Sequence, residues 1–134
     1  MIAVDTNVLV RLLTDDDREQ AAAARSLFAA QQIWIAKTVL LETGWVLGSL
    51  YGFEESAIRE AFTKLLGLRN VQVEDEPSVA AALTLTSHGI ELADAMHLSS
   101  RPHGTAFLSF DQSFVRRAKR AGAASVSGIP FKKR

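Results

Sequence analysis

Four acidic residues in this 134-residue sequence have the type and the surroundings that metal-assisted chemistry requires. Asp5 and Asp111 each follow directly after a short apolar run, whereas Glu42 and Asp94 each lie inside an apolar stretch. If folding brings the four carboxylates together, they create a negative pocket that only a cation neutralises. Carboxylate oxygens suit hard ions, so Mg²⁺ or Mn²⁺, held by one or two carboxylates with water and a substrate phosphate, is the expected occupant.

Taken one at a time, three of these acids have a plainer structural explanation. Aspartate is a favoured N-cap residue, and Asp5 and Asp111 each stand where a strand is expected to give way to a helix. Asp94 is equally explained as a first-turn acid that the positive end of a helix dipole stabilises. The prediction of a site therefore depends on the joint placement of the acids.

Glu42 is the acid whose position is least expected of a surface residue. Helical spacing places it on the same side as Val39, Trp45 and Val46. Burying a carboxylate there without a partner costs several kcal/mol, so a compensating cation or hydrogen-bond donor is expected nearby. The alternative is that Glu42 lies on a partly exposed helix edge.

The composition predicts a single globular domain over residues 1–134. Hydrophobic residues make up 48% of the chain and no low-complexity linker interrupts it, so only residues 129–134 or thereabouts are expected to form a flexible tail. The chain has no cysteine, which excludes disulfides and thiolate zinc sites and leaves oxygen or imidazole as metal ligands. Neither a secretory signal nor a stretch of membrane-spanning length is evident, so we expect a cytoplasmic protein without a membrane partner.

The net charge of zero conceals a strong asymmetry along the chain. Residues 1–100 carry 7 Lys/Arg against 14 Asp/Glu, a net charge of −7, and residues 101–134 carry 8 against 1, a net charge of +7. An acidic site beside a basic rim suits an anionic substrate, with Arg116, Arg117 and Lys119 as candidate contacts. The alternative is that these cations complement the dipole at the end of a helix and that the basic tail is simply solvated.

Short apolar runs alternate with helical periodicity along the chain. Capping residues or proline before the helical segments, and glycine after several of them, set their limits. The acidic residues 15–17 precede the second helix and are interpreted as a capping segment. Expected strands cover residues 2–5, 33–36, 71–74, 106–110 and 124–127, and expected helices cover residues 7–13, 18–32, 38–51, 54–68, 77–88, 92–100 and 111–121.

This alternation predicts an α/β fold. We expect a three-layer α/β/α sandwich around a mostly parallel central sheet of four to five short strands, joined by right-handed crossovers. Ligands of such sheets bind outside the carboxyl ends of the strands. Because Asp5 and Asp111 both follow expected strand ends, we expect the first and fourth strands to be neighbours.

The segments that contain these acids resemble, in order and spacing, the four acidic motifs of PIN domains. They are Val-Asp-Thr-Asn-Val-Leu-Val at 4–10, Leu-Leu-Glu at 40–42, Leu-Ala-Asp-Ala at 92–95 and Phe-Leu-Ser-Phe-Asp at 107–111. Each segment alone is a weak signal, but the ordered set covers essentially the whole chain. More narrowly, the chain looks like the toxin of a bacterial type II (VapBC) toxin–antitoxin pair.

The resemblance implies a PIN-like fold and an endoribonuclease that hydrolyses RNA phosphodiester bonds to 5′-phosphate and 3′-hydroxyl ends. It implies that Asp5 and Asp94 bind Mg²⁺, for which Mn²⁺ is expected to substitute. Asp111 and Glu42 complete the catalytic cluster, and Glu42 is expected to act through water.

The resemblance also implies supporting residues and partners. Thr6 and Asn7 match the small polar residues beside the family's first acid, and Ser109 keeps the hydroxyl of a threonine that many relatives have there. The implied partners are an RNA substrate and a VapB-type antitoxin, whose basic tail would enter the acidic pocket. A homodimer is also implied, and the helices at 38–51 and 54–68 offer apolar faces that a monomer's core would equally use.

Other functional classes stay open at this point. A haloacid-dehalogenase-type phosphatase also places an aspartate after its first strand, but it needs Asp-x-Asp, and residue 7 is Asn. A PIN nuclease that is not a toxin is a second alternative. A degenerate PIN domain that only binds a partner is a third, against which the intact set of four acids argues.

Overall fold

Three short strands form a parallel sheet in the order β1-β2-β3. In the computed structural model, which describes residues 1–133, β1 covers Ile2–Ala3, β2 covers Ile33–Ile35 and β3 covers Val71–Val73. The outer residues of β2 and β3 are buried, whereas Gln72 at the centre of β3 is exposed. The sheet therefore buries one face more completely than the other.

Six helices accompany this sheet. They are α1 (Thr6–Leu13), α2 (Arg18–Ala30), α3 (Lys37–Ser49), α4 (Glu55–Leu66), α5 (Glu76–Thr86) and α6 (Leu92–Ser99). Their buried side chains include Leu9, Leu40, Leu47 and Phe62, each at most 1% exposed. Burying one such side chain contributes about 1.5–3 kcal/mol. These side chains belong to one hydrophobic cluster that also contains buried residues of the sheet. Within residues 1–133, no helix combines the length and the apolarity that crossing a bilayer demands.

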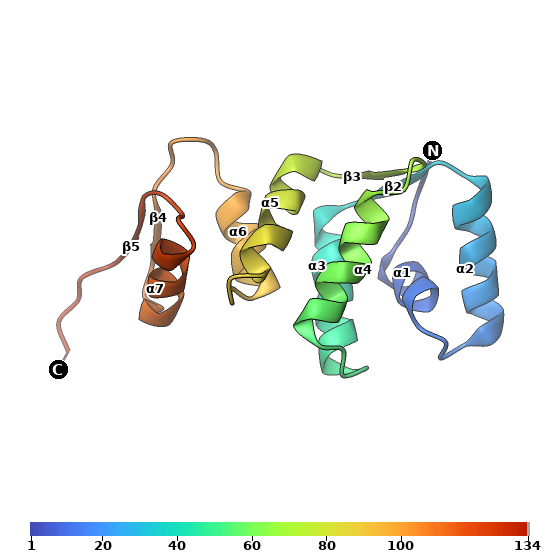
Figure 1. Ribbon diagram of the computed structural model, residues 1–134, viewed down its shortest axis with the longest axis horizontal. Coiled ribbons are helices and arrows are strands. Elements are labelled where there is room, and N and C mark those ends of the chain that lie inside the picture. Colours follow the sequence, from blue (N-terminus) through green and yellow to red (C-terminus); the bar gives the residue numbers. More distant parts are fainter. Residues whose placement is uncertain (134) are drawn as a thin grey trace.

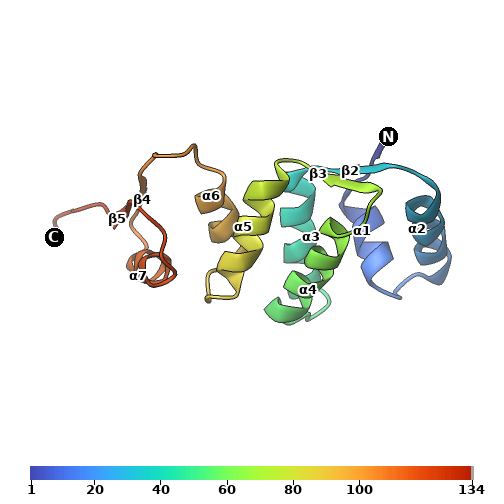
Figure 2. The ribbon, with the colours of Figure 1, turned by 45° about the horizontal axis from the view of Figure 1, so that its top comes forward.

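The C-terminal residues form a second, smaller unit. Strands β4 (Phe107–Ser109) and β5 (Val126–Gly128) pair in parallel, and α7 (Gln112–Arg120) connects them. Figures 1 and 2 both show α5 and α6 lying between this unit and the sheet of β1, β2 and β3. We call residues 1–100 the body, residues 101–106 the linker and residues 107–133 the arm.

Two basic side chains hold the linker at its ends. The Lys37 ammonium donates a 3.1 Å hydrogen bond to the Ser100 hydroxyl, which ties the end of α6 to the start of α3. The Arg101 guanidinium donates to the carbonyl oxygens of Thr105 at 2.8 Å and Ala124 at 2.7 Å, which ties the linker to the arm. A crevice of about 550 Å³ lies between α5, α6 and the arm. Phe114, Val115 and Val126 of the arm nevertheless belong to the same hydrophobic cluster as the buried side chains of the body.

The expected α/β class with parallel strands is confirmed, and the element limits agree to within a few residues. The five strands, however, form a three-stranded and a two-stranded sheet in place of one. The prediction that the first and fourth strands are neighbours is wrong for a single chain, because β1 pairs with β2 and β4 pairs with β5. The reason is that α5 and α6 lie between the three-stranded sheet and β4, as Figures 1 and 2 show. Residues 129–133 follow β5 without helix or strand, and residue 134 of the expected tail lies outside the described residues.

The interpretation of residues 15–17 as a capping segment is confirmed at Asp17. Its carboxylate accepts a 3.0 Å hydrogen bond from the Gln20 N–H at the start of α2. We expect Asp17→Ala to lower the free energy of unfolding by about 1 kcal/mol, because the cap is lost. Asp15→Ala, at an exposed position two residues earlier, is the matched control and should change it by less than about 0.5 kcal/mol. Urea unfolding followed by circular dichroism measures both, and equal effects would contradict the capping account.

Candidate functional site

Asp5 lies where β1 meets α1, as the sequence predicts. Its carboxylate accepts a 3.2 Å hydrogen bond from the Val8 N–H and so caps α1. The residue is exposed, and the bond to Val8 involves only one of its two carboxylate oxygens. Asp5 is therefore both a cap and an accessible ligand candidate.

Glu42 lies in α3 and is joined to the residue beside Asp5. The Thr6 hydroxyl donates a short hydrogen bond to Glu42 Oε1. This contact brings the first and second acidic segments, 36 positions apart, to one place. Thr6 thus contacts Glu42 directly, and its role in supporting a metal site stays a prediction.

The surroundings of Glu42 differ from the expected apolar face. Glu42 is exposed, and Trp45, one turn further along α3, is 65% exposed. The reason is that this side of α3 borders an open groove in place of packed helices. The burial cost argued from the sequence therefore does not arise, and the exposed helix edge is the correct alternative.

Asp94 lies in the first turn of α6 and is half-buried. The next residue, Ala95, and Leu98 one turn later are buried in the core, which fixes the helix that carries Asp94. Within the described residues, the Asp94 carboxylate has neither a hydrogen bond nor an ion pair. Its position agrees with an acid held for a ligand, and with a first-turn acid that the helix dipole stabilises.

Asp111 lies in the arm, at the end of β4. Its carboxylate accepts a 3.0 Å hydrogen bond from the Phe114 N–H and caps α7. Its own backbone N–H donates to the Ser109 hydroxyl at 2.9 Å, and the role of Ser109 in supporting a metal site stays a prediction. The arm lies beyond α5 and α6, which separates Asp111 from the strand that carries Asp5.

A single chain does not assemble the expected four-carboxylate cluster. Among residues 1–133, no three Asp, Glu, His or Cys side chains are placed to hold one metal ion. The oxygen donors fit Mg²⁺ chemically, but one chain does not gather enough of them in one place. The separation of the arm from β1 in Figures 1 and 2 keeps Asp111 apart. Asp5, Glu42 and Asp94 all belong to the body, and within the described chain they are not grouped around one ion position either.

In the described part of the chain, the remaining predicted residues make no hydrogen bond or ion pair with Asp5 or Glu42. Arg116, Arg117 and Lys119 are exposed on α7, where Arg117 and Lys119 belong to the last turn and complement the helix dipole. Asn7 is exposed in the first turn of α1. None of the three basic side chains makes an ion pair within the described residues, so all are accessible to an anion.

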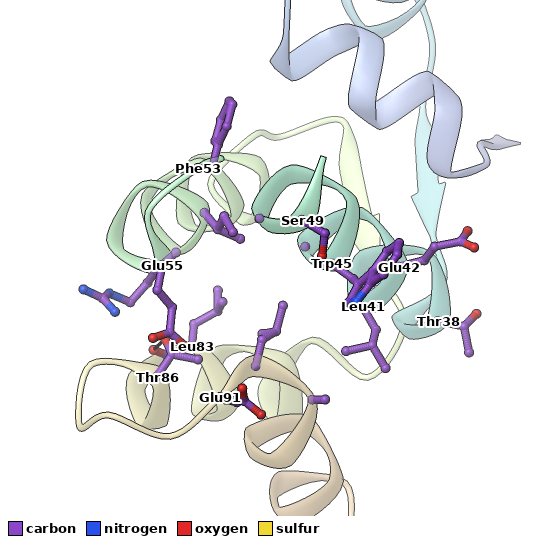
Figure 3. Close-up of a pocket in the computed structure, with 16 residues that line it drawn as sticks. Thr38, Leu41, Glu42, Trp45, Ser49, Phe53, Glu55, Leu83, Thr86 and Glu91 are labelled. Carbon is purple, nitrogen blue, oxygen red and sulfur yellow. Dashed lines mark hydrogen bonds between the residues drawn. The ribbon is translucent and has the colours of Figure 1, made fainter. Parts of the chain in front are cut away.

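Sequence reasoning missed an apolar groove of about 760 Å³ between α3, α4, α5 and α6. Figure 3 shows Trp45 and Leu41 on one side and Leu83 on the other. Glu42, Glu55 and Glu91 bring carboxylates to its border. Trp45 and Gly48, a large and a small residue one helical turn apart, both line this groove. Helical spacing alone does not distinguish a groove from a core.

A second acidic pair lies at the carboxyl end of β3. Glu74 accepts a 3.0 Å hydrogen bond from the Lys37 N–H, and Asp75 forms a 3.1 Å ion pair with the Lys37 ammonium. The hydrogen bond from Ser78, and then that from Lys37, lower the pKa of the Asp75 carboxyl below its usual value. These contacts satisfy both acids within the body, so they act as structural partners of α3 and α5.

Comparison with protein families gives one match: the PIN-domain profile aligns with residues 2–120. The chain belongs to the PIN-domain family. PIN domains are generally nucleases, so membership indicates that this protein is a nuclease. Comparison with curated proteins gave no match, and comparison with solved structures gave none either.

The double role of Asp5 in this PIN domain leads to a stability prediction. Asp5→Asn keeps an oxygen that accepts from Val8, so we expect the free energy of unfolding to stay within about 0.5 kcal/mol of wild type. Asp5→Ala removes the acceptor and should lower it by about 1 kcal/mol. Urea unfolding in metal-free buffer is the measurement. If both variants lose the same stability, the cap does not account for the position of Asp5.

Proposed function

We propose that this PIN domain is a Mg²⁺-dependent endoribonuclease that acts as the toxin of a type II toxin–antitoxin pair. The observation that carries the proposal is the hydrogen bond from Thr6 to Glu42, which joins the first two acidic segments at the carboxyl end of β1. Ligands of parallel sheets bind at that end of the strands. The family to which the chain belongs supports the same activity.

The proposed metal ligands are the four carboxylates. Asp5 and Asp94 would bind the ion directly, Asp111 would complete the set, and Glu42 would act through water. Mg²⁺, or Mn²⁺ in its place, would supply charge neutralisation at the phosphate and a more acidic bound water, which removes the need for a histidine base. Such ions bind through few carboxylates and keep several waters, so exposed acids suit them.

The chain's own residues prepare this site before any ligand binds. The Thr6 hydroxyl fixes one oxygen of Glu42 and leaves the other for water. The Ser109 hydroxyl accepts a hydrogen bond from the Asp111 N–H and so orients the turn that contains this acid. The accessible cations of α7 would hold the RNA backbone without reading its sequence.

The toxin role requires a protein that restrains the nuclease. The groove along α3 is apolar inside, and Glu42, Glu55 and Glu91 border it. An amphipathic antitoxin segment with basic flanks fits such a surface, because its apolar side fills the groove and its cations meet the carboxylates. Occupying the groove would also bring a basic side chain next to Glu42. We place this activity in the cytoplasm, together with the RNA substrate.

Two other activities make different predictions. A haloacid-dehalogenase-type phosphatase would hydrolyse a phosphomonoester, but residue 7, where that class needs a second aspartate, is Asn. A PIN domain that only binds a partner would cleave nothing with either metal. Parallel assays with RNA and with a phosphomonoester, each with and without Mn²⁺, separate the three.

Asp94 gives the sharpest activity test. We expect Asp94→Asn to lower Mg²⁺-dependent RNA cleavage by at least about 100-fold, because a direct ligand is lost, and to leave the circular dichroism spectrum unchanged. The matched control is Glu54→Gln, an exposed carboxylate at the N-cap of α4 that makes no side-chain cap bond. That control should retain wild-type cleavage.

Metal removal completes this test. Dialysis against EDTA should abolish cleavage by the wild type, and Mg²⁺ or Mn²⁺ should restore it. Undiminished cleavage by Asp94→Asn, or by the wild type in EDTA, would falsify the metal-dependent mechanism.

A further inference from the structure

Among the described residues, four strands have an edge without a strand neighbour: β1, β3, β4 and β5. Asp5 and Asp111 follow β1 and β4, so these are the two edges next to the candidate site. β1 pairs only with β2, and β4 pairs only with β5. Ile2 in β1 is 37% exposed, and Leu108 in β4 is 55% exposed. Parallel strands are normally buried within a sheet, and an open edge is a template for another strand. Both edges therefore lack a neighbour.

The hydrogen bonds within each sheet identify the free backbone groups. Ile2 and Val4 donate to carbonyls beside or within β2, at 2.7 and 3.4 Å, so the N–H and C=O of Ala3 point to the open edge. Phe107 donates to the carbonyl of Ser125 at 2.9 Å, so the backbone of Leu108 points away from β5. Each open edge thus presents backbone N–H and C=O groups that can pair with another parallel strand.

A chain's own arm is held away from its own β1. The bond from Lys37 to Ser100 fixes the end of α6, and the bonds from Arg101 fix the linker against the arm. α5 and α6 stand between the two open edges in both views of the molecule. A second copy of the chain, in contrast, reaches the open edge of β1 without this obstacle.

Charge favours contact between a body and an arm. The body, residues 1–100, carries a net charge of −7, and the arm, residues 107–133, carries 6 Lys/Arg against 1 Asp, a net charge of +5. A crevice of about 550 Å³ lies between the arm and α5 and α6, although Phe114 and Val115 of the arm join the hydrophobic cluster of the body. The body and the arm are therefore complementary in charge. In a dimer with a two-fold axis, each arm can contact the body of the other chain at the same time.

We propose that two copies of this chain exchange arms, so that β4 of each copy pairs in parallel with β1 of the other. The exchange completes a sheet in the order β3-β2-β1-β4-β5. The metal site then combines Asp5 of one copy with Asp111 of the second. This last statement rests on the proposed nuclease function, whereas the strand exchange itself does not.

The free backbone groups select the register of the exchanged strands. When Ala3 lies opposite Ser109 of the second copy, its N–H donates to the carbonyl of residue 108 and its C=O accepts from the N–H of residue 110. Two residues further on, Asp5 then lies beside Asp111, with their backbones about 4.8 Å apart. The same register places Ile2 beside Leu108.

Cysteine cross-linking tests the exchange without any assay of activity. The natural chain has no cysteine, so Ile2→Cys/Leu108→Cys introduces the only two thiols, both at exposed positions. A short bis-maleimide should convert this variant to a covalent dimer on a denaturing gel. Either single variant, and the matched control Ile2→Cys/Leu50→Cys, whose second position is 70% exposed on the body, should stay monomeric. A link within one chain, or no link, overturns the proposal.

Complementation then tests the shared site. Asp5→Asn and Asp111→Asn should each be inactive, but refolding an equal mixture should restore about a quarter of wild-type cleavage, because half the dimers are mixed and each has one intact site. A covalent dimer whose mixture stays inactive would overturn the shared site and leave the strand exchange standing. If the wild type itself cleaves no RNA, the proposed function fails and the cross-linking result still decides the exchange.

Discussion

The open edge of β1 is the constraint on which the rest of this structure depends. β1 is only two residues long, and it carries Asp5 at its carboxyl end and Thr6 immediately after it. One edge is satisfied by β2, and the other leaves the backbone of Ala3 without a strand partner. Whatever strand covers that edge also decides which side chains meet Asp5, because neighbouring parallel strands bring their ends to the same place. Which side chains complete the candidate site therefore depends on which strand pairs with β1.

The body and the arm each prepare a part of this site independently. In the body, the bond from Thr6 to Glu42 joins segments that are 36 positions apart, and the core beneath α1 and α3 holds both in place. In the arm, Ser109 and the cap on α7 orient Asp111 before any contact with the body. Both aspartates at strand ends are helix caps as well as ligand candidates, so the capping and the functional explanations are compatible. One carboxylate oxygen caps the helix and the second remains available.

Local features of the fold could be predicted from the sequence because local physics determines them. A short apolar run predicted the limits of β2, and capping residues predicted the starts of α2 and α7, all within about two residues. The sequence also indicated Thr6 and Ser109 as supporting residues, and both make such a contact. The position of the arm could not be predicted, since it depends on the long-range bonds of Arg101 and Lys37. Whether Glu42 is buried or exposed could not be decided from the sequence, because helical spacing does not reveal that α3 borders a groove.

The central claim is that carboxylates of the body and the arm form one divalent-metal site in this PIN domain. The most direct measurement is the anomalous scattering of Mn²⁺ in crystals of the wild-type protein grown with that ion. The account predicts one peak per site, bound by Asp5 and Asp94 of one chain and by Asp111 of a second chain. A peak remote from these carboxylates, or one bound by Asp5 and Asp111 of the same chain, would contradict it.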